Sequence, residues 1–347
     1  MVLEGGNRMS KYLLSFLFAV GVINAGFAQD VTFENALRAV RVNCSGISDK
    51  LSEIKKLAGI NTAVTGVGTV VGAGAIATGA EKSKLDKISD NLEQQIQNFM
   101  QAEANATPVE VENFIGLQTE LAELLKNDEL KKYMEQIKSA DISPEEFSQT
   151  VKDQNYVQKL QELKTKTDEE SKKFGNARTG LLATTTATNI AGAVIAGVNR
   201  IDADFASQIG ACMGAVKSLS LVKMQAKLDG SASVQDIVAA DKIISVCDKF
   251  NTEDLEKINN RATGATVASS VGAATGLAGT ITSGVANSES VRTGADVQKE
   301  KNLNTASNVL AGVTTAATLT STVFNATQVA AAKRVIETAE LCEEAIK

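Results

Sequence analysis

The sequence predicts an all-α protein built from long helical hairpins. Three observations lead to this prediction: four long stretches contain no charged residue, only 2 prolines occur among 347 residues, and all 4 cysteines lie a short distance outside these stretches. Proline interrupts helices, so a long chain with so few prolines favours long continuous helices. The uncharged segments are residues 57–80, 179–199, 262–288 and 302–332.

The first element is an expected export signal. A basic start precedes an apolar run over residues 12–23, and a small-residue sequence ends at Ala28. This order is typical of a secretory signal peptide, and the run is short for the alternative, an uncleaved membrane anchor. We expect residues 1–28 to be the signal, with Met9 as the true start. The codons before Met9 can contain a bacterial ribosome-binding sequence, which favours an exported bacterial protein.

The uncharged segments are rich in Gly, Ala and Thr, and they contain two GxxxG pairs. Gly68 and Gly72 form the first pair, and Gly272 and Gly276 form the second. Small residues four apart on a helix create a flat groove that lets a second helix approach closely. This pattern resembles the glycine-zipper segments of membrane proteins. We therefore expect these four glycines to be helix-packing residues.

The segments also resemble one another, which suggests that one helical unit was duplicated. The third segment matches the first without a gap: Leu51, Ile54, Val67, Gly68 and Gly72 align with Leu255, Ile258, Val271, Gly272 and Gly276. The fourth resembles the second when the sequence starting at Thr186 is set beside the one starting at Thr305.

Each uncharged segment is long enough to cross the hydrocarbon core of a bilayer. Thr, Ser, Asn and Gly lower their hydropathy, so a soluble bundle with a core of alanine and threonine is the alternative. We favour membrane association, with the first two segments as the better candidates. Asn61 and Asn189 would each need a polar partner in lipid, and Thr184–Thr186 are expected to bond back to helix carbonyls.

The domain organisation follows the change from uncharged to charged sequence. We assign residues 29–80 to an N-terminal helix and the first segment, and residues 81–177 to a charged helical insert. Residues 178–288 hold the second and third segments, joined by a helical hairpin that turns at Gly230. Residues 289–347 form a linker, the fourth segment and a C-terminal helix.

The charged insert carries two expected helix starts, each a capping box that contains proline, at Pro108 and at Pro144. Its simplest interpretation is a small helical bundle, or a pair of long helices that extend the first two segments. A docking domain for a partner helix is the functional alternative.

The cysteines predict two disulfides, because exported proteins meet an oxidising compartment. Cys212 and Cys247 lie at similar distances on either side of Gly230, so a hairpin there places them at the same height. We therefore predict Cys212–Cys247 and Cys44–Cys342. If all four segments cross one membrane, every cysteine lies on the same side.

Composition excludes several classes of function. The chain has 0 histidines, which rules out histidine-dependent catalytic triads and histidine-ligated zinc. The net charge of −6 lacks the excess of positive charge that is typical of proteins that bind nucleic acid. We find no catalytic, cofactor-binding or metal-binding residues, and we expect a protein that is not an enzyme.

Three hypotheses for the function remain. The first is a bacterial cell-envelope protein with a structural or assembly role at the inner membrane or in the periplasm. The second is a secreted α-helical pore-forming protein, and the third is a soluble periplasmic binding module. Membrane lipid is the expected partner, with a helical protein or a second copy of the chain as further candidates.

Overall fold

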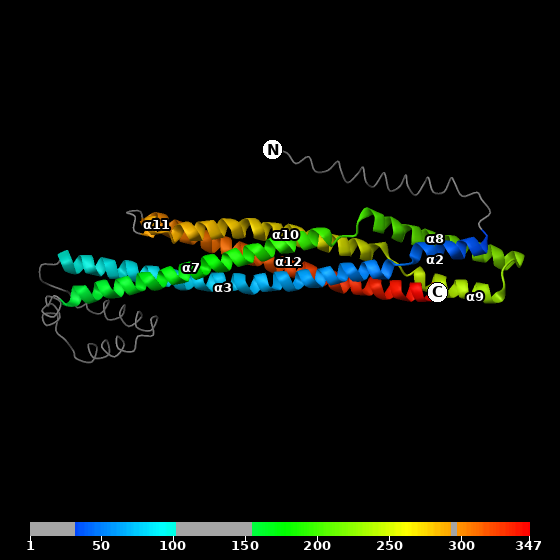
Figure 1. Cartoon of the computed structure of the whole chain (residues 1–347), viewed down its shortest axis with the longest axis horizontal. Coiled ribbons are helices and arrows are strands. Elements are labelled where there is room, and N and C mark those ends of the chain that lie inside the picture. The colour runs from blue at the N-terminus through cyan, green and yellow to red at the C-terminus, as the bar shows by residue number, and fades with distance from the viewer. Residues whose placement is uncertain (1–31, 102–154, 293–296) are drawn as a thin grey trace, which may run out of the picture. The chain divides into compact units, whose positions relative to one another are not determined.

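The structure is a computed structural model that describes residues 32–101, 155–292 and 297–347 (Figure 1). The all-α prediction is confirmed, since the described part of the chain is helical and contains no strand. The predicted signal peptide over residues 1–28 and the predicted helix starts at Pro108 and Pro144 lie outside the described residues.

Eight helices are seen within the described ranges, and four of them are long. Their bounds are α2 Phe33–Cys44, α3 Ile47–Gln101, α7 Asn155–Val198, α8 Ala203–Asp229, α9 Val234–Cys247, α10 Thr252–Ala286, α11 Glu289–Arg292 and α12 Val297–Ile346. The change from uncharged to charged sequence after residue 80 is not a helix end, because α3 continues through it to Gln101. Similarly, α7 begins at Asn155 and continues into the second uncharged segment. In the described part, the insert therefore consists of extensions of these two helices.

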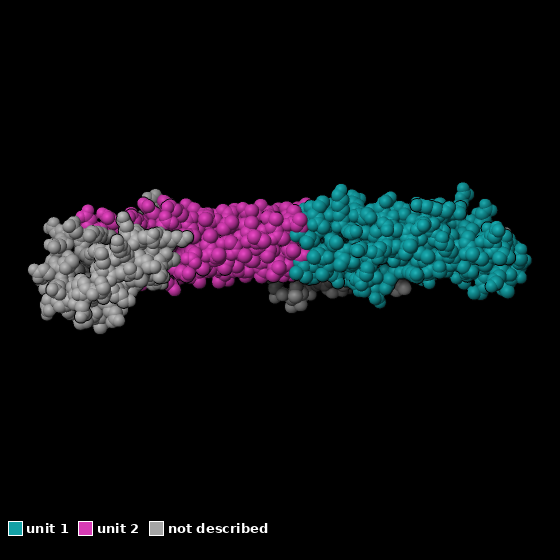
Figure 2. All heavy atoms as spheres, turned by 90° about the horizontal axis from the view of Figure 1, so that it is seen from below, with its two compact units in different colours: residues 1–62, 195–265, 323–347 teal, residues 63–194, 266–322 magenta. Residues whose placement is uncertain are grey.

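The chain divides into two compact units, which are described separately (Figure 2). Unit 1 comprises residues 1–62, 195–265 and 323–347. Unit 2 comprises residues 63–194 and 266–322.

Unit 1 contains well-capped helices and a core of large aliphatic side chains. α8 ends at Gly230, whose φ of 68° is the left-handed conformation that glycine adopts most easily. α9 then begins with a capping box formed by Ser233 and Asp236. The predicted helical turn at Gly230 is thus confirmed, and Lys223 of α8 forms an ion pair with Asp241 of α9 across it.

The core of unit 1 joins its helices through ordinary hydrophobic burial. Its members come from all parts of the unit and are nearly inaccessible to solvent, as in Val40, Ile47, Leu51, Ile209, Leu219, Ile258 and Ile336. Burying a side chain of this size contributes about 1.5–3 kcal/mol to stability. The helices of unit 1 are therefore held together mainly by a hydrophobic core.

Unit 2 is a bundle of parts of α3, α7, α10 and α12 in which neighbouring helices are antiparallel (Figure 1). α7 and α10 meet through Thr179 and Ser283, whose hydroxyls are 2.9 Å apart. α10 and α12 meet through Thr275 and Thr314, also 2.9 Å apart. α3 borders both α7 and α12, and its contacts with them are described below.

The contacts within unit 2 support the predicted duplication. In unit 2, Gly72 of α3 lies against Thr315 of α12, and Gly276 of α10 lies against Thr186 of α7 in the corresponding way. The first and third segments therefore match as the sequence predicts. The match of the second and fourth segments is corrected: Thr186 corresponds to Thr315 and not to Thr305. Similar short runs of Ala, Thr and Asn at both places made the sequence alignment ambiguous.

Candidate functional site

The interior of unit 2 contains many polar side chains beside a small apolar cluster of Ala75, Leu182 and Ala311, and several of the polar side chains are hydrogen-bonded between helices. Asn189 of α7 donates from Nδ2 to Thr318 Oγ1 of α12 at 2.8 Å, and both residues have no exposed surface. Ser269 of α10 and Ser321 of α12 are equally buried, with hydroxyls 2.7 Å apart. Buried polar groups are costly when unpaired, so these bonds are what makes a polar interior stable.

The outer surface of the same unit is apolar. Between residues 63 and 80, all of them described, the exposed side chains are Ala63, Val67, Val70, Ala73, Ile76, Ala77 and Ala80. The other three segments also expose large apolar residues, namely Ile190, Val194, Val267, Val271, Leu277, Ile281, Val285, Val309, Val313 and Leu319. Val70 is 73% exposed.

Few polar side chains interrupt this surface. Within the described ranges 179–194, 266–285 and 302–322, the exposed polar residues are Thr184, Ser270, Asn302, Thr305, Asn308 and Thr320. Thr184 and Thr320 donate their hydroxyl protons to their own helices, at Gly180 O and Ala316 O. The uncharged part of unit 2 thus combines an interior rich in polar side chains with a mostly apolar outer surface.

The four predicted packing glycines all lie in unit 2 and are buried. They do not lie against other glycines. A Cβ at Gly72 would lie 2.6 Å from Thr315 Oγ1, and one at Gly276 would lie 2.5 Å from Thr186 Oγ1. Gly68 lies against Thr188 and Thr318 in the same way, and Gly272 lies against Asn189. The grooves therefore receive hydroxyl and amide side chains from α7 and α12.

Threonine hydroxyls in these helices bond back to the preceding turn, as the sequence predicts. Thr185 donates to Leu181 O at 2.9 Å, and Thr186 donates to Leu182 O at 2.8 Å. A hydroxyl used in this way needs no water, so threonine is acceptable in a helix that lies in an apolar environment.

Both predicted asparagine partners are present. Asn61, in unit 1, donates to Asn325 Oδ1 at 3.0 Å, and Asn189, in unit 2, donates to Thr318. Each amide is therefore bonded to a side chain from α12.

Three stretches of helix are long and apolar enough to cross a membrane: Phe33–Gln94, Gln161–Asp229 and Gln298–Ile346. Only 28% to 33% of the most apolar window of each is buried, so the rest of each window is half-buried or exposed. Among the described residues, α10 does not meet this criterion. Its uncharged segment is diluted by Thr, Ser and Gly, as the sequence indicated for the later segments.

Charged side chains gather next to the uncharged segments of unit 2. Lys82 of α3 is 1% exposed and donates to Asp86 Oδ2 at 2.6 Å and to Glu300 Oε1 at 3.2 Å. Asp86 also accepts from Ser171 of α7 and from Asn304 of α12. This buried ammonium group therefore has two carboxylate partners, and the cluster ties three helices together.

Arg178 of α7 is also 1% exposed, but its Nε and Nη2 have no hydrogen-bond partner. Its guanidinium lies beside Gly79 of α3, where a Cβ would be 3.0 Å from Arg178 Nε and Cζ. Burial lowers the pKa of Arg178 from 12.5 to about 10, so the side chain stays charged at neutral pH. The sequence reasoning missed this residue, although it is the last charge before the uncharged segment begins at residue 179.

The two disulfides differ from the predicted pairs. The structure joins Cys44 to Cys212 and Cys247 to Cys342, so the predicted bonds Cys212–Cys247 and Cys44–Cys342 are wrong. The hairpin at Gly230 determines the position of the cysteines along the helix axes. It does not determine which neighbouring helix each cysteine contacts. α2 packs against α8, which brings Cys44 to Cys212, and the end of α9 lies against α12.

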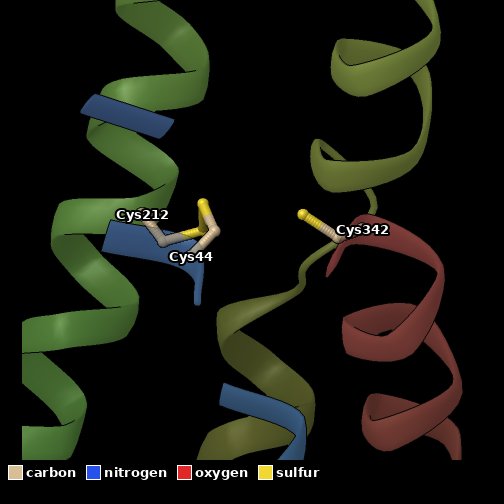
Figure 3. A group of neighbouring side chains, drawn as sticks. All are labelled: Cys44, Cys212 and Cys342. Atoms are coloured by element: carbon tan, nitrogen blue, oxygen red, sulfur yellow. A yellow bond between two sulfur atoms is a disulfide. The ribbon is translucent and has the colours of Figure 1, made fainter. Parts of the chain in front are cut away.

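The cysteines nevertheless lie close together, as the prediction of a common side requires. The sulfur atoms of Cys44, Cys212 and Cys342 are within 4.8 Å of one another, and all three residues are buried (Figure 3). All four sulfurs are used in disulfides, so the cluster offers no thiolate to a metal ion. The two bonds also follow the duplication, because Cys44 and Cys247 each end a short helix that precedes a long one.

No protein-family model, curated protein or solved structure matches this chain.

Proposed function

We propose that this chain is a bacterial cell-envelope protein that is embedded in a membrane through unit 2 and is not an enzyme. The polarity of unit 2 carries the proposal. Its hydrogen-bonded interior pairs Asn189 with Thr318 and Ser269 with Ser321, and its outer surface is apolar. In water, an exposed apolar surface of this extent marks a site that something else covers.

Lipid is the covering medium that fits this surface best. The uncharged part of α3, residues 57–80, has a length of about 36 Å at 1.5 Å per residue, against a hydrocarbon core of about 30 Å. Helices that associate in lipid use small residues and hydrogen-bonding side chains at their interfaces. Both features are present in unit 2, in the glycine grooves and in the Thr, Ser and Asn side chains that fill them.

The disulfides support an orientation. Cys44, Cys212, Cys247 and Cys342 all belong to unit 1, and disulfides persist in oxidising compartments such as the periplasm. Four membrane crossings would place these cysteines on the periplasmic side and residues 81–177 on the other side. A signal peptide at residues 1–28 would direct the chain to export. The resulting role is structural or in assembly, with lipid as the main partner.

Membrane fractionation of the producing cells tests this proposal. Membranes are washed with alkaline carbonate and then extracted with a nonionic detergent. An embedded bundle stays in the carbonate pellet and is released only by detergent. Recovery of the protein in the carbonate supernatant would contradict the proposal and would favour a peripheral or soluble bundle.

A secreted pore-forming protein is the second candidate, favoured by the polar interior of unit 2. Side chains such as Thr275, Thr314 and Asn189 would line a water-filled path if the helices separated after insertion. The same fractionation distinguishes this candidate: a pore-former is released in soluble form first and appears in target membranes later.

A further inference from the structure

The side chain of Arg178 is in an unusual position for a buried cation. Lys82, the other large buried cation in unit 2, has two carboxylate partners at 2.6 and 3.2 Å. Arg178 has no ion-pair partner in the described residues, and burial is the cause of its lowered pKa. An uncompensated buried charge is strongly unfavourable, so a missing partner is indicated.

The atoms without partners define the geometry of that partner. Nε and Nη2 lie on the same edge of the guanidinium, and their N–H groups point in the same direction. This edge binds two oxygens of one carboxylate or phosphate group through two parallel hydrogen bonds.

The duplication allows Arg178 to be compared with an equivalent residue. In the register that matches Asn189 with Thr318 and Thr186 with Thr315, Arg178 corresponds to Ser307 of α12. Ser307 is also fully buried, and its hydroxyl donates to Gly279 O at 3.3 Å. A small neutral residue therefore fills the equivalent place in the second half of the bundle.

We propose that Arg178 is a binding residue for a phosphate group, held side-on by Nε and Nη2. Gly79 contributes by leaving room for the guanidinium, which occupies the place of a side chain. Asn308 Oδ1 approaches the same place, 2.6 Å from a Cβ at Gly79, so rotation of the Asn308 amide would offer the phosphate a further donor. The site lies among α3, α7 and α12.

Two sources supply this chemistry, a phospholipid headgroup and free phosphate. The lipid source rests on the proposed function, because Arg178 directly precedes the uncharged segment and would lie near the headgroups if that segment spans. The free-phosphate source does not depend on membrane insertion.

Thermal unfolding of the full chain, followed by circular dichroism at 222 nm, tests the site. The wild type is purified in alkyl maltoside, which contains no phosphate, and is then titrated with inorganic phosphate at constant ionic strength or with dioleoylphosphatidylglycerol. Binding raises the midpoint, by roughly 5 °C at one hundred times the dissociation constant. A rise with inorganic phosphate identifies a free anion, and a rise only with the phospholipid identifies a headgroup.

Two variants make the test specific. Arg178→Ser introduces the residue type found at Ser307, the position of α12 that corresponds to Arg178. It should abolish the rise while leaving the midpoint without phosphate unchanged or higher, because the unpaired charge is gone. Arg200→Gln removes an exposed arginine at the other end of the second segment and should keep the full rise.

The proposal is overturned if neither phosphate source raises the wild-type midpoint, or if Arg178→Ser shows the same rise as the wild type. A lower midpoint for Arg178→Ser without any phosphate also contradicts it, since that result assigns Arg178 a structural role. Each of these outcomes is independent of the carbonate fractionation, so failure of the site and failure of the membrane proposal are distinguishable.

Discussion

Asn189 of α7 and Thr318 of α12 are joined by a hydrogen bond that is inaccessible to solvent. Asn189 Nδ2 donates to Thr318 Oγ1 at 2.8 Å, and Thr318 Oγ1 lies 2.7 Å from Thr314 O, where its own proton can be donated. The amide thus reaches the backbone of a second helix through one hydroxyl. This bond is the clearest example of how unit 2 uses polar groups inside the bundle.

Removal of Thr318 alone should destabilise unit 2 more than removal of both partners. Thr318→Val leaves the buried Asn189 amide without this bond, at a cost of about 1–3 kcal/mol, whereas after Asn189→Leu the Thr318 hydroxyl keeps its bond to Thr314 O. The double variant loses the bond without leaving that group, so the two effects should be less than additive. A double-mutant cycle from chemical unfolding in detergent measures the coupling, and strict additivity would show that the bond contributes nothing.

Replacing glycine by alanine should lower the stability of the protein at one position on α3 and raise it at another. Gly72→Ala places a methyl group 2.6 Å from Thr315 Oγ1, and Thr315 is fixed by its bond to Ala311 O at 2.8 Å. We expect a loss of about 1–3 kcal/mol. Gly66 has open space where a Cβ would lie, so Gly66→Ala should stabilise by up to about 1 kcal/mol through helix propensity.

Larger substitutions extend this comparison. Gly72→Leu and Gly276→Leu should lower the thermal midpoint far more than Val71→Leu, because only the glycines face a neighbouring helix at close range. Equal midpoints for the three variants, in detergent and in lipid, would mean that the glycine grooves are incidental.

The disulfides should be mapped as Cys44–Cys212 and Cys247–Cys342. Peptide mapping without reduction checks the pairing directly. Loss of either bond through a double Cys→Ser change should destabilise the protein by up to about 5 kcal/mol, because each closes a long loop of the unfolded chain. A peptide that links Cys212 to Cys247 would restore the pairing expected from the hairpin alone.

A charge on the apolar surface of unit 2 should prevent membrane integration. Val70→Lys adds a cost of about 2.5–3.5 kcal/mol at the centre of a spanning helix. Val42→Lys is the matched control, because Val42 is 68% exposed on α2, compared with 73% for Val70. The fraction recovered in the carbonate pellet should fall for Val70→Lys and remain unchanged for Val42→Lys. An equal effect of the two changes would argue against a membrane-specific surface.

Much of the fold could be predicted from local sequence. The scarcity of proline and the uncharged segments indicated long helices, and Gly230 marked a turn because its conformation is a local property. The alignment of Gly68 and Gly72 with Gly272 and Gly276 also matches the structure, since all four are buried in one unit. These features depend on short stretches of chain.

Lateral relationships between helices could not be predicted in the same way. The spacing around Gly230 placed Cys212 and Cys247 at one height, but four cysteines at one height allow more than one pairing. Arg178 was missed for the same reason. Its isolation depends on which side chains α3 and α12 present to it, and no local pattern in α7 records that.

The most direct test of membrane embedding is the solvent exposure of Val70 in lipid. The described cysteines are all in disulfides, so a cysteine introduced at position 70 can carry a spin label. In lipid bilayers, the account predicts that this label is accessible to oxygen and shielded from a water-soluble nickel chelate, while a label at the exposed Lys84 shows the reverse. Access of the nickel chelate to both labels would contradict the account and would place unit 2 in water.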